Sequence, residues 1–256
     1  MGKNKLKKFA EMKGFSCVLQ YPFAALEAAG GFPLRGRWRT DFFHNDNPIV
    51  LELGCGKGEY TVGLAQEAAD KNYIGIDIKG ARLWRGAKTA TELEMSNVAF
   101  VRTGIELLDN FFEPGEVDEI WITFPDPQMQ KTRKRLVSAR FLELYRKVLR
   151  HNGMIHLKTD SPFLYTFARR LVEHNNLPVE FDSDNLYASG RDDAATRIQT
   201  FYEKQWLARG KNIRLISFRL PMDGELNDPA EDDIPRDDYR SLPRGVIQQT
   251  TVLQPE

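Results

Sequence analysis

The chain has 256 residues, of which 41% are hydrophobic and 28% are charged, as in a globular protein of one or two domains. It has no apolar run near the roughly 20 residues that cross a bilayer, its basic start lacks the apolar core of a signal peptide, and its two cysteines are too few for a disulfide framework. Composition therefore argues against a membrane-spanning or disulfide-stabilised protein and predicts a cytoplasmic protein with reduced cysteines.

The formal net charge is zero, but the charges are unevenly distributed along the chain. Residues 221–256 contain nine acidic and three basic residues, residues 131–150 contain eight basic residues and one Glu, and residues 1–8 contain four lysines. A single cluster of this kind is usually solvated surface. A basic body with an acidic tail nevertheless favours a phosphate-rich partner.

Strands and helices are predicted to alternate from residue 48 onward. The predicted strands span residues 48–54, 72–77, 97–102, 118–124, 154–160, 179–184 and 212–220. The predicted helices span residues 60–70, 80–94, 138–150, 162–174 and 201–209. The helix over 138–150 has apolar residues at helical spacing and is expected to end at Asn152-Gly153.

This alternation predicts an α/β fold with a mostly parallel, doubly wound sheet, and the last two strands predict an antiparallel edge. Residues 1–45 have weak periodicity and are predicted to form a basic N-terminal extension. Residues 221–256 are rich in Pro and Asp and are predicted to form a disordered or loosely packed tail.

The first predicted strand runs into the glycine-rich stretch ELGCGKGEY, residues 52–60. Glycines permit a tight turn and the close approach of a ligand. The spacing is not the G-x-G-x-x-G of a dinucleotide site, because Glu59 stands at the third position, and no Gly-Lys-Ser/Thr phosphate loop follows. Glu52 places a carboxylate just before the turn, where it would repel a pyrophosphate and suit a ligand with a cationic end. A purely structural turn is the alternative, and we favour ligand binding.

This E-x-G-x-G-x-G pattern resembles the first motif of Rossmann-like methyltransferases that use S-adenosylmethionine. In that resemblance Gly54 and Gly56 lie against the methionine and ribose part of the cofactor, and Asp77 binds the ribose hydroxyls. Asp77 comes 23 positions after Gly54, near the roughly 20 expected for a ribose-binding acid. A charge at a helix N-terminus is the alternative role for Asp77.

A second unusual stretch, FPDPQMQKTRKR at residues 124–135, holds Asp126 between two prolines and follows it with four cationic side chains. A proline pushes the residue before it toward extended conformations, so Phe124 and Asp126 are both predicted to be extended. Ligands of this fold class bind at the carboxyl ends of the strands. Asp126 is therefore predicted to lie beside the methyl donor.

Several motifs together resemble the bacterial tRNA (guanine-N7)-methyltransferases. They are TFPDP with its basic stretch, RFLELYRKVL at 140–149, GMIHLKTD at 153–160, and TFYE at 200–203 with GKNI at 210–213. The resemblance covers about residues 46–220, which it identifies as a Rossmann-like methyltransferase domain. It implies methyl transfer from S-adenosylmethionine to N7 of a guanosine in tRNA, at position 46 of the variable loop. The partner it implies is tRNA. Neither a metal nor a membrane is expected, and both a monomer and a homodimer stay open.

The resemblance also carries over roles for individual residues. Asp126 is the catalytic position of the family. The implied cofactor contacts are Glu52, Gly54, Gly56, Asp77, Gly104 and Asp126. The implied substrate contacts are Gln130, Lys131, Asp160, Thr200, Phe201, Tyr202 and Glu203. The implied tRNA phosphate contacts, which would position the RNA rather than read it, are Arg133, Lys134 and Arg135.

Some positions depart from the family pattern. Many members have a tryptophan where this chain has Gln128 and a lysine where it has Gln130, so Lys131 is the candidate replacement for that lysine. Asp77 stands where Glu is common, and Gly104 offers only backbone atoms. These changes affect the expected affinity for substrate more than the reaction class.

Guanine N7 carries a lone pair and no proton, so Asp126 is not expected to act as a base. Its carboxylate would accept hydrogen bonds from the guanine N1–H and N2 edge and stabilise the developing charge. Structural alternatives exist elsewhere, because Thr200 and Glu203 also form a capping-box pattern and Asp160 suits a turn or cap. The competing functions are methyl transfer to another RNA or to a small molecule, and a non-catalytic RNA-binding relative.

Overall fold

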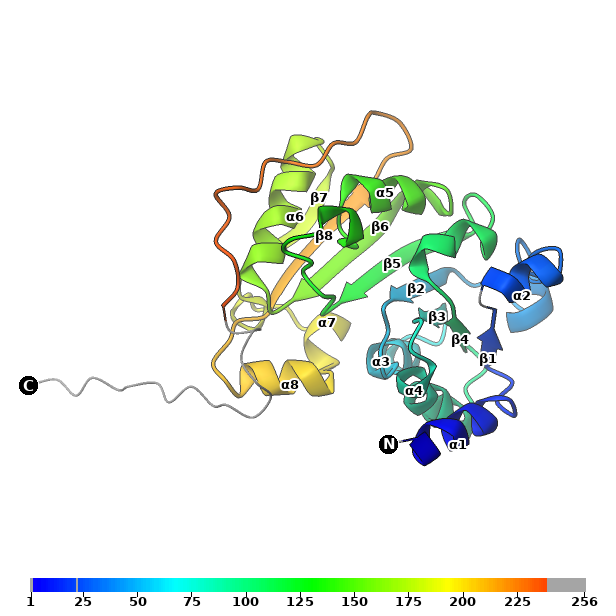
Figure 1. The fold of residues 1–256 in the computed structure, drawn as a ribbon. Coiled ribbons are helices and arrows are strands. Elements are labelled where there is room, and N and C mark those ends of the chain that lie inside the picture. The colour runs from blue at the N-terminus through cyan, green and yellow to red at the C-terminus, as the bar shows by residue number, and fades with distance from the viewer. Residues whose placement is uncertain (1, 22, 239–256) are drawn as a thin grey trace, which may run out of the picture.

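The computed structural model describes residues 2–21 and 23–238, and within them eight strands form one sheet in the order β1-β4-β3-β2-β5-β6-β8-β7 (Figure 1). The strands are β1 (Val18–Gln20), β2 (Ile49–Leu53), β3 (Asn72–Ile76), β4 (Val98–Arg102), β5 (Val117–Thr123), β6 (Leu149–Thr159), β7 (Val179–Ser183) and β8 (Arg214–Leu220). Neighbouring strands from β1 to β6 run parallel, whereas β8 pairs antiparallel with both β6 and β7. The predicted parallel sheet with an antiparallel edge is confirmed.

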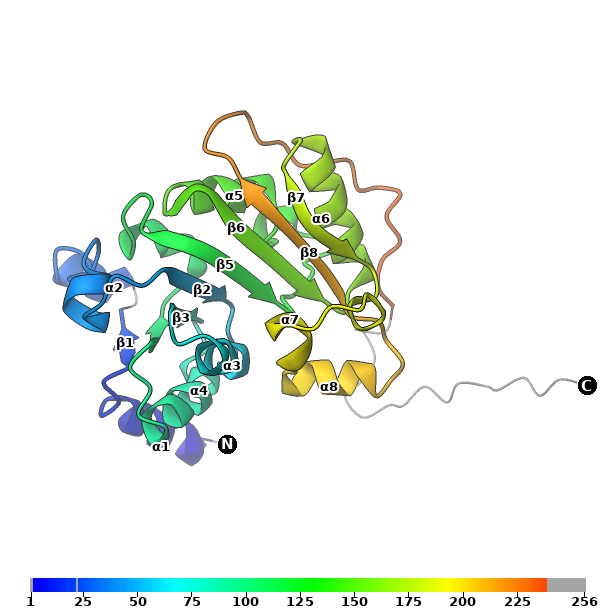
Figure 2. The same cartoon turned by 180° about the vertical axis from the view of Figure 1, so that it is seen from behind.

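Helices cover both faces of the sheet. They are α1 (Gly2–Met12), α2 (Phe23–Ala28), α3 (Glu59–Glu67), α4 (Gly80–Glu92), α5 (Ala139–Arg146), α6 (Pro162–His174), α7 (Ala194–Arg197) and α8 (Phe201–Leu207), with π- or 3-10 turns η1 (Trp38–Phe43), η2 (Ile105–Asn110), η3 (Thr132–Lys134) and η4 (Leu186–Ala188). The views from front and back place α5 and α6 on one face, and α1, α3, α4, α7 and α8 on the other (Figures 1 and 2). Among the described residues, no helix has the length and apolar character that crossing a bilayer requires.

Strand β2 shows why the sheet is buried on both sides. All five of its residues are buried, which is typical of a parallel strand covered by helices on each face. Side chains alternate between the faces: Val50 packs in the cluster that contains Leu83 of α4, and Leu51 in the one that contains Phe141 of α5.

The first 45 residues belong to this body rather than extending from it. Strand β1 pairs in parallel with β4 at the sheet edge, with Val18 opposite Phe100. Trp38 is fully buried, and its Nε1–H donates to the Phe111 carbonyl at 2.9 Å. Trp38 is therefore a core residue, and the predicted N-terminal extension of residues 1–45 packs onto the rest of the sheet.

The helix predicted over 138–150 is too long. Helix α5 ends at Arg146, and Leu149 already pairs with Val117 of β5 as the first residue of β6. The register then shifts, and Asn152 takes a positive φ of 54° inside the strand rather than after a helix. A short apolar run fits either element by periodicity alone, and pairing with β5 decides it.

Residues 221–238, which we call the acidic strap, were predicted to be loose but pack against the body. The strap leaves β8 and runs around α6 (Figure 1). Leu226 and Ile234 are buried. The Asp228 carboxylate accepts a hydrogen bond from the Ala139 N–H at the start of α5, at 2.7 Å. Apolar anchors and a helix-capping carboxylate therefore fix this part, whereas residues 239–256 of the predicted tail lie outside the described residues.

Candidate active site

The glycine turn between β2 and α3 combines an open side with a packed one. Gly54, Gly56 and Gly58 all have positive φ, at 77°, 55° and 68°. A Cβ added at Gly58 would lie 2.6 Å from Cε1 of Phe100, whereas one at Gly54 or Gly56 would meet no atom closer than 3.9 Å. Gly58 is thus required for packing, and the first two glycines leave room for a ligand.

Glu52 lies behind the turn and is 3% exposed. Its Oε2 accepts a hydrogen bond from the Thr61 N–H at 2.8 Å and another from the Thr61 hydroxyl, and its Oε1 accepts one from the Thr123 hydroxyl at 2.6 Å. Burial raises the pKa of Glu52 to about 7, although these donors oppose the rise. The carboxylate therefore joins α3 to β5, and a cationic group nearby would favour its charged form.

Asp77 follows β3 and closes the turn from the other side. Its Oδ2 accepts from the Gly56 N–H at 2.9 Å, and its Oδ1 accepts from the Lys79 N–H at 2.6 Å. Strand pairing places Leu53 beside Ile76 and Ile76 beside Val101. The residues that follow these three strands therefore share one edge of the sheet.

One predicted residue, Gly104, and one that was not predicted, Ile78, also lie at this edge. The half-buried Gly104 directly follows the buried Thr103 at the end of β4, where only its backbone can contact a ligand. Ile78, which was not among the predicted residues, is 65% exposed beside Asp77. An isoleucine directly after a strand-end acid was the signal available in the sequence, and its exposed side chain offers an apolar surface to a flat ring.

Asp126 lies exposed in the loop after β5. Its Oδ1 accepts a hydrogen bond from the Gln128 N–H at 3.0 Å, which makes a tight turn around Pro127. The preceding Phe124 has a φ of 48° and is left-handed, so the prediction that it is extended is wrong. Its N–H still donates to the Lys158 carbonyl of β6 at 2.8 Å, and this continuation of the sheet ladder fixes the unusual backbone.

A buried ion pair lies between the end of β6 and α8. The Lys158 ammonium is 2.7 Å from Oε1 of Glu203, and both side chains are 0% exposed. The Tyr187 hydroxyl donates to the same Oε1 at 2.7 Å. Burial lowers the pKa of Lys158, and the Glu203 carboxylate opposes this shift. Lys158 was not predicted as a site residue, although a lysine within the apolar stretch MIHLKT was a visible signal.

The capping box at the start of α8 is confirmed and gives Glu203 a structural role. The Glu203 N–H donates to the Thr200 hydroxyl at 3.2 Å, and the Thr200 N–H donates to Glu203 Oε2 at 3.3 Å. Both carboxylate oxygens of Glu203 therefore have partners inside the protein. The expected direct contact between this carboxylate and a substrate does not fit its complete burial.

Helix α8 instead presents aromatic side chains beside the glycine turn. Phe201 is 47% exposed, and the Lys57 ammonium lies 3.9 Å from the centre of its ring. The Phe201 N–H donates to the Glu59 carboxylate at 3.1 Å, and the half-buried Tyr202 ring is 5.9 Å from the same ammonium. The structure thus brings residues 57–59 and 200–202 together, although they are distant in sequence.

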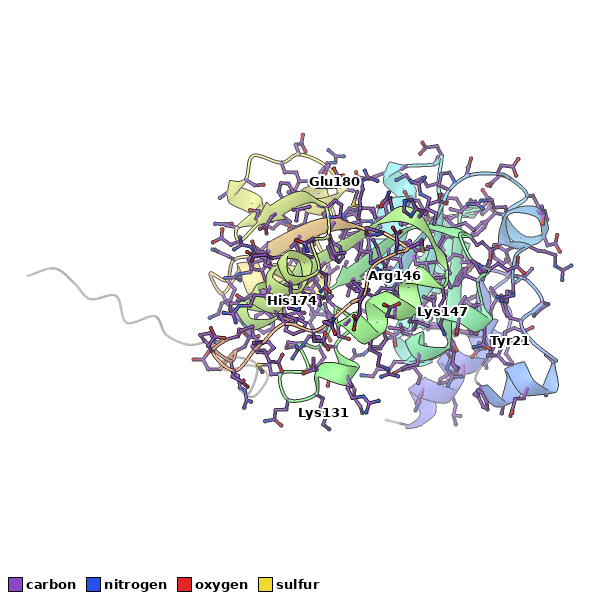
Figure 3. All side chains as sticks on the ribbon, turned by 90° about the horizontal axis from the view of Figure 1, so that it is seen from above. Tyr21, Lys131, Arg146, Lys147, His174 and Glu180 are labelled. Carbon is purple, nitrogen blue, oxygen red and sulfur yellow. The ribbon has the colours of Figure 1, made fainter. Side chains whose placement is uncertain are left out.

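Three of the four predicted cationic residues after Asp126 are exposed. They are Lys131, Arg133 and Lys134, next to the exposed Gln130. Figure 3 shows Lys131 at the rim of the molecule, pointing away from the sheet. This arrangement suits contacts with a polyanion.

Arg135 is the exception, because it is 0% exposed. Its guanidinium is 2.5 Å from Oε2 of Glu231 and lies 4.0 Å from the ring centre of Phe167. The prediction that Arg135 contacts tRNA phosphates is therefore wrong. An arginine within a basic run resembles a surface residue, and its acidic partner lies 96 positions away in the sequence.

Asp160, at the end of β6, is 1% exposed and lines a cavity of about 530 Å³. The walls of this cavity also include Lys211 from the segment before β8, Arg214 from the start of β8, and Ile234 and Asp237 from the acidic strap. The Arg214 guanidinium donates to the Asp160 carbonyl at 3.1 Å. Asp160 is thus part of a polar recess at the same end of the strands as the glycine turn.

Comparisons with known proteins agree with this geometry. A family model described as "Putative methyltransferase" matches residues 46–216. The chain is 54% identical over 245 residues to the tRNA (guanine-N(7)-)-methyltransferase of Bacteroides fragilis, which covers 96% of each chain. It is 61% identical over 241 residues to the protein of the same name from Porphyromonas gingivalis, which covers 93% of this chain and 98% of that one.

Two solved structures share the fold at low sequence identity. An antibiotic-related methyltransferase has 19% identity and a TM-score of 0.52 over 70% of this chain and 90% of its own. The 16S rRNA methyltransferase KamB has 12% identity and a TM-score of 0.54 over 79% of this chain and 95% of its own. These likenesses confirm the Rossmann-like methyltransferase fold. The sequence relatives go further, and the chain belongs to the tRNA (guanine-N7)-methyltransferase family.

Proposed function

We propose that this protein transfers a methyl group from S-adenosylmethionine to N7 of a guanosine in tRNA, and that the target is position 46 of the variable loop. The observation that carries the proposal is the convergence at one sheet edge of the open glycine turn and the Asp77 carboxylate with the exposed Asp126, which follows β5, the parallel neighbour of β2. Relatives named for this activity match almost the whole chain.

The residues at this edge fit the proposed cofactor. The open side of Gly54 and Gly56 admits an extended ligand against the backbone, Asp77 can accept hydrogen bonds from ribose hydroxyls, and Ile78 can cover one face of the adenine. Bound there, S-adenosylmethionine supplies an electrophilic methyl group on a sulfonium. Glu52 lies behind the turn, and a nearby cation favours its charged form. The negative charge of its carboxylate then stabilises the positive end of this ligand.

Asp126 holds the nucleophile. Guanine N7 has a lone pair and needs no base, so the carboxylate accepts hydrogen bonds from the N1–H and N2 edge of the base. This contact orients N7 in line with the methyl group and stabilises the positive charge that develops on the ring. The base must leave its stack to reach this edge, and Phe201 is an exposed ring near the glycine turn against which it can rest.

The exposed cations after Asp126 position the RNA. Lys131, Arg133 and Lys134 contact phosphates, which contributes affinity without reading the sequence. Lys131 takes the place of the lysine that the family usually has at position 130. The base itself is recognised at Asp126, and the recess that Asp160 lines, at the same end of the strands, is a second place for substrate contacts.

The test is to incubate the purified protein with labelled S-adenosylmethionine and unmodified tRNA transcripts. Borohydride reduction and aniline cleavage then locate any 7-methylguanosine. We expect cleavage at the variable-loop guanosine, and no label in a matched transcript with adenosine at that position. Label in ribosomal RNA fragments instead of tRNA would favour the alternative of another RNA substrate. Cofactor binding without transfer to any RNA would contradict the proposed reaction.

A further inference from the structure

We propose that the acidic strap positions the Asp126 loop, and that Glu231 is the residue through which it does so. The proposal rests on the function proposed above, because Asp126 is placed there at the reacting base. It assigns a role to the acidic residues after β8. Glu231 would act through Arg135 and would not touch the substrate.

The Arg135 guanidinium joins the strap to the loop. It donates to the Pro127 carbonyl at 3.0 Å and to the Gln128 carbonyl at 3.2 Å, and it pairs with the Glu231 carboxylate at 2.5 Å. The other Glu231 oxygen accepts from the Thr132 hydroxyl at 2.9 Å. Both carbonyls that Arg135 holds belong to the two residues directly after Asp126.

The backbone of this loop needs such support. Phe124 and Gln128 flank Asp126, and both have positive φ, at 48° and 47°. Residues other than glycine are disfavoured in this region and stay there only when their surroundings fix them. The turn closed by the Gln128 N–H and the Asp126 carboxylate depends on this strained residue. Arg135 fixes the same residue through its carbonyl.

Glu231 can orient Arg135 because the strap is anchored on both sides of it. Before it, Asp228 caps α5 through the Ala139 N–H. After it, Asp237 accepts hydrogen bonds from the Phe163 N–H at 3.1 Å and from the Ser161 hydroxyl at the start of α6. These anchors place the Glu231 carboxylate over a guanidinium that is 0% exposed.

The strap contacts the loop at a second point. The Asp237 N–H lies 3.3 Å from the sulfur of Met129, the residue after Gln128. The Met129 side chain packs against the hydrophobic core. The strap therefore borders the loop from the Arg135 side and from the Met129 side, while Asp126 itself is exposed toward solvent.

Removing the Glu231 carboxylate should leave Arg135 without its ionic partner and free the loop to leave its strained conformation. A misplacement of about 1 Å at a reacting group costs roughly 100-fold in rate. We expect Glu231→Ala to lower the single-turnover rate of methyl transfer by about 10- to 100-fold. The Kd for S-adenosylmethionine should stay near its wild-type value, because the residues of the glycine turn are not bonded to Arg135 or Glu231.

The matched control is Asp233→Ala. Asp233 lies on the same strap and pairs with Arg170 of α6 at 2.6 Å on the surface, where its side chain is 71% exposed. Asp233→Ala removes the same charge as Glu231→Ala and should retain the wild-type rate.

A double variant, Arg135→Met with Glu231→Leu, separates positioning from stability, because apolar replacement of a buried ion pair is often neutral for folding. It lacks the donors to the two carbonyls and should remain slow although folded.

Hydrogen exchange of the amides of Gln128 and Met129 gives a readout that is independent of turnover. Exchange should accelerate in Glu231→Ala and stay unchanged in Asp233→Ala. The proposal is overturned if Glu231→Ala matches Asp233→Ala in rate and exchange, or if the folded double variant turns over like wild type. Failure of the proposed function would look different, because the wild-type protein itself would then form no 7-methylguanosine in tRNA.

Discussion

Replacing Gly56 or Gly58 with alanine should separate packing from ligand binding within one turn. Both residues have positive φ, so either alanine would cost roughly 1–2 kcal/mol for a left-handed conformation. At Gly58 the added Cβ would also lie 2.6 Å from Phe100 and 3.1 Å from the Cα of Gly86, and overpacking of this kind costs about 1–3 kcal/mol. Gly58→Ala should therefore lower the free energy of unfolding by about 2–5 kcal/mol, and Gly56→Ala by only about 1–2 kcal/mol.

For cofactor binding the order should reverse. A Cβ at Gly56 meets no protein atom closer than 3.9 Å, so it would project into the space that we assign to the cofactor. Gly56→Ala should weaken the binding of S-adenosylmethionine by about 10-fold or more, which corresponds to about 1.4 kcal/mol. Folded Gly58→Ala should bind it nearly as well as wild type.

Urea unfolding followed by circular dichroism measures the first quantity, and titration calorimetry under conditions where both variants are folded measures the second. Wild-type cofactor affinity in Gly56→Ala would refute the placement of the ligand at this turn. Equal unfolding free energies in the two variants would refute the assignment of Gly58 to packing against Phe100.

Three further predictions concern single side chains. Asp126→Asn should lower the single-turnover rate by about 10- to 100-fold, which is the loss expected for a hydrogen bond to a charged group. Thermal unfolding should be unchanged because Asp126 is exposed, and a rate near wild type would argue against its contact with the base. The pKa of Glu52 is raised from 4.5 to about 7 in the folded protein. Its bound proton therefore stabilises the folded protein fully below about pH 4.5, and this stabilisation is lost as the pH rises through 7. Glu52→Gln should lack this decline, which amounts to at most about 3 kcal/mol in the free energy of unfolding, and parallel pH profiles of the two proteins would show that Glu52 titrates normally. Arg133→Ala should reduce the slope of log K for tRNA binding against log salt concentration by about 0.7–0.9. Arg135→Ala should leave this slope unchanged and lower the free energy of unfolding by about 3–5 kcal/mol. A reduced slope in both variants would mean that Arg135 reaches the RNA.

The regular part of the fold could be predicted because its signals are local. The buried run of β2, the glycines after it and the acid after β3 each follow from a few neighbouring residues, and parallel pairing then places Glu52, Gly54 and Asp77 at one edge. The boundary between α5 and β6 could not be predicted in this way, because Leu149 fits a helix by spacing and a strand only through its pairing with Val117.

The errors at the candidate site have the same physical origin. Arg135 lies in a basic run that is typical of a surface, and only its distant partner in the strap explains its burial. Glu203 fits both a capping residue and a substrate contact, and the buried Lys158 favours the first. A sequence pattern reports local periodicity and charge, whereas these two roles depend on contacts between segments far apart in the chain.

The separation of Arg135 and Glu231 has a consequence for synthesis of the protein. Arg135 leaves the ribosome 96 residues before its carboxylate partner, which at about 5–20 residues per second is a delay of roughly 5–20 s. During this interval the strands up to β6, and later β8, can assemble into the sheet. The Arg135 guanidinium, which donates to the Pro127 carbonyl, meanwhile lacks the Glu231 carboxylate. The segment around Asp126 would thus be among the last parts of the nascent enzyme to reach its final form, and translation would order maturation of the site after assembly of the sheet.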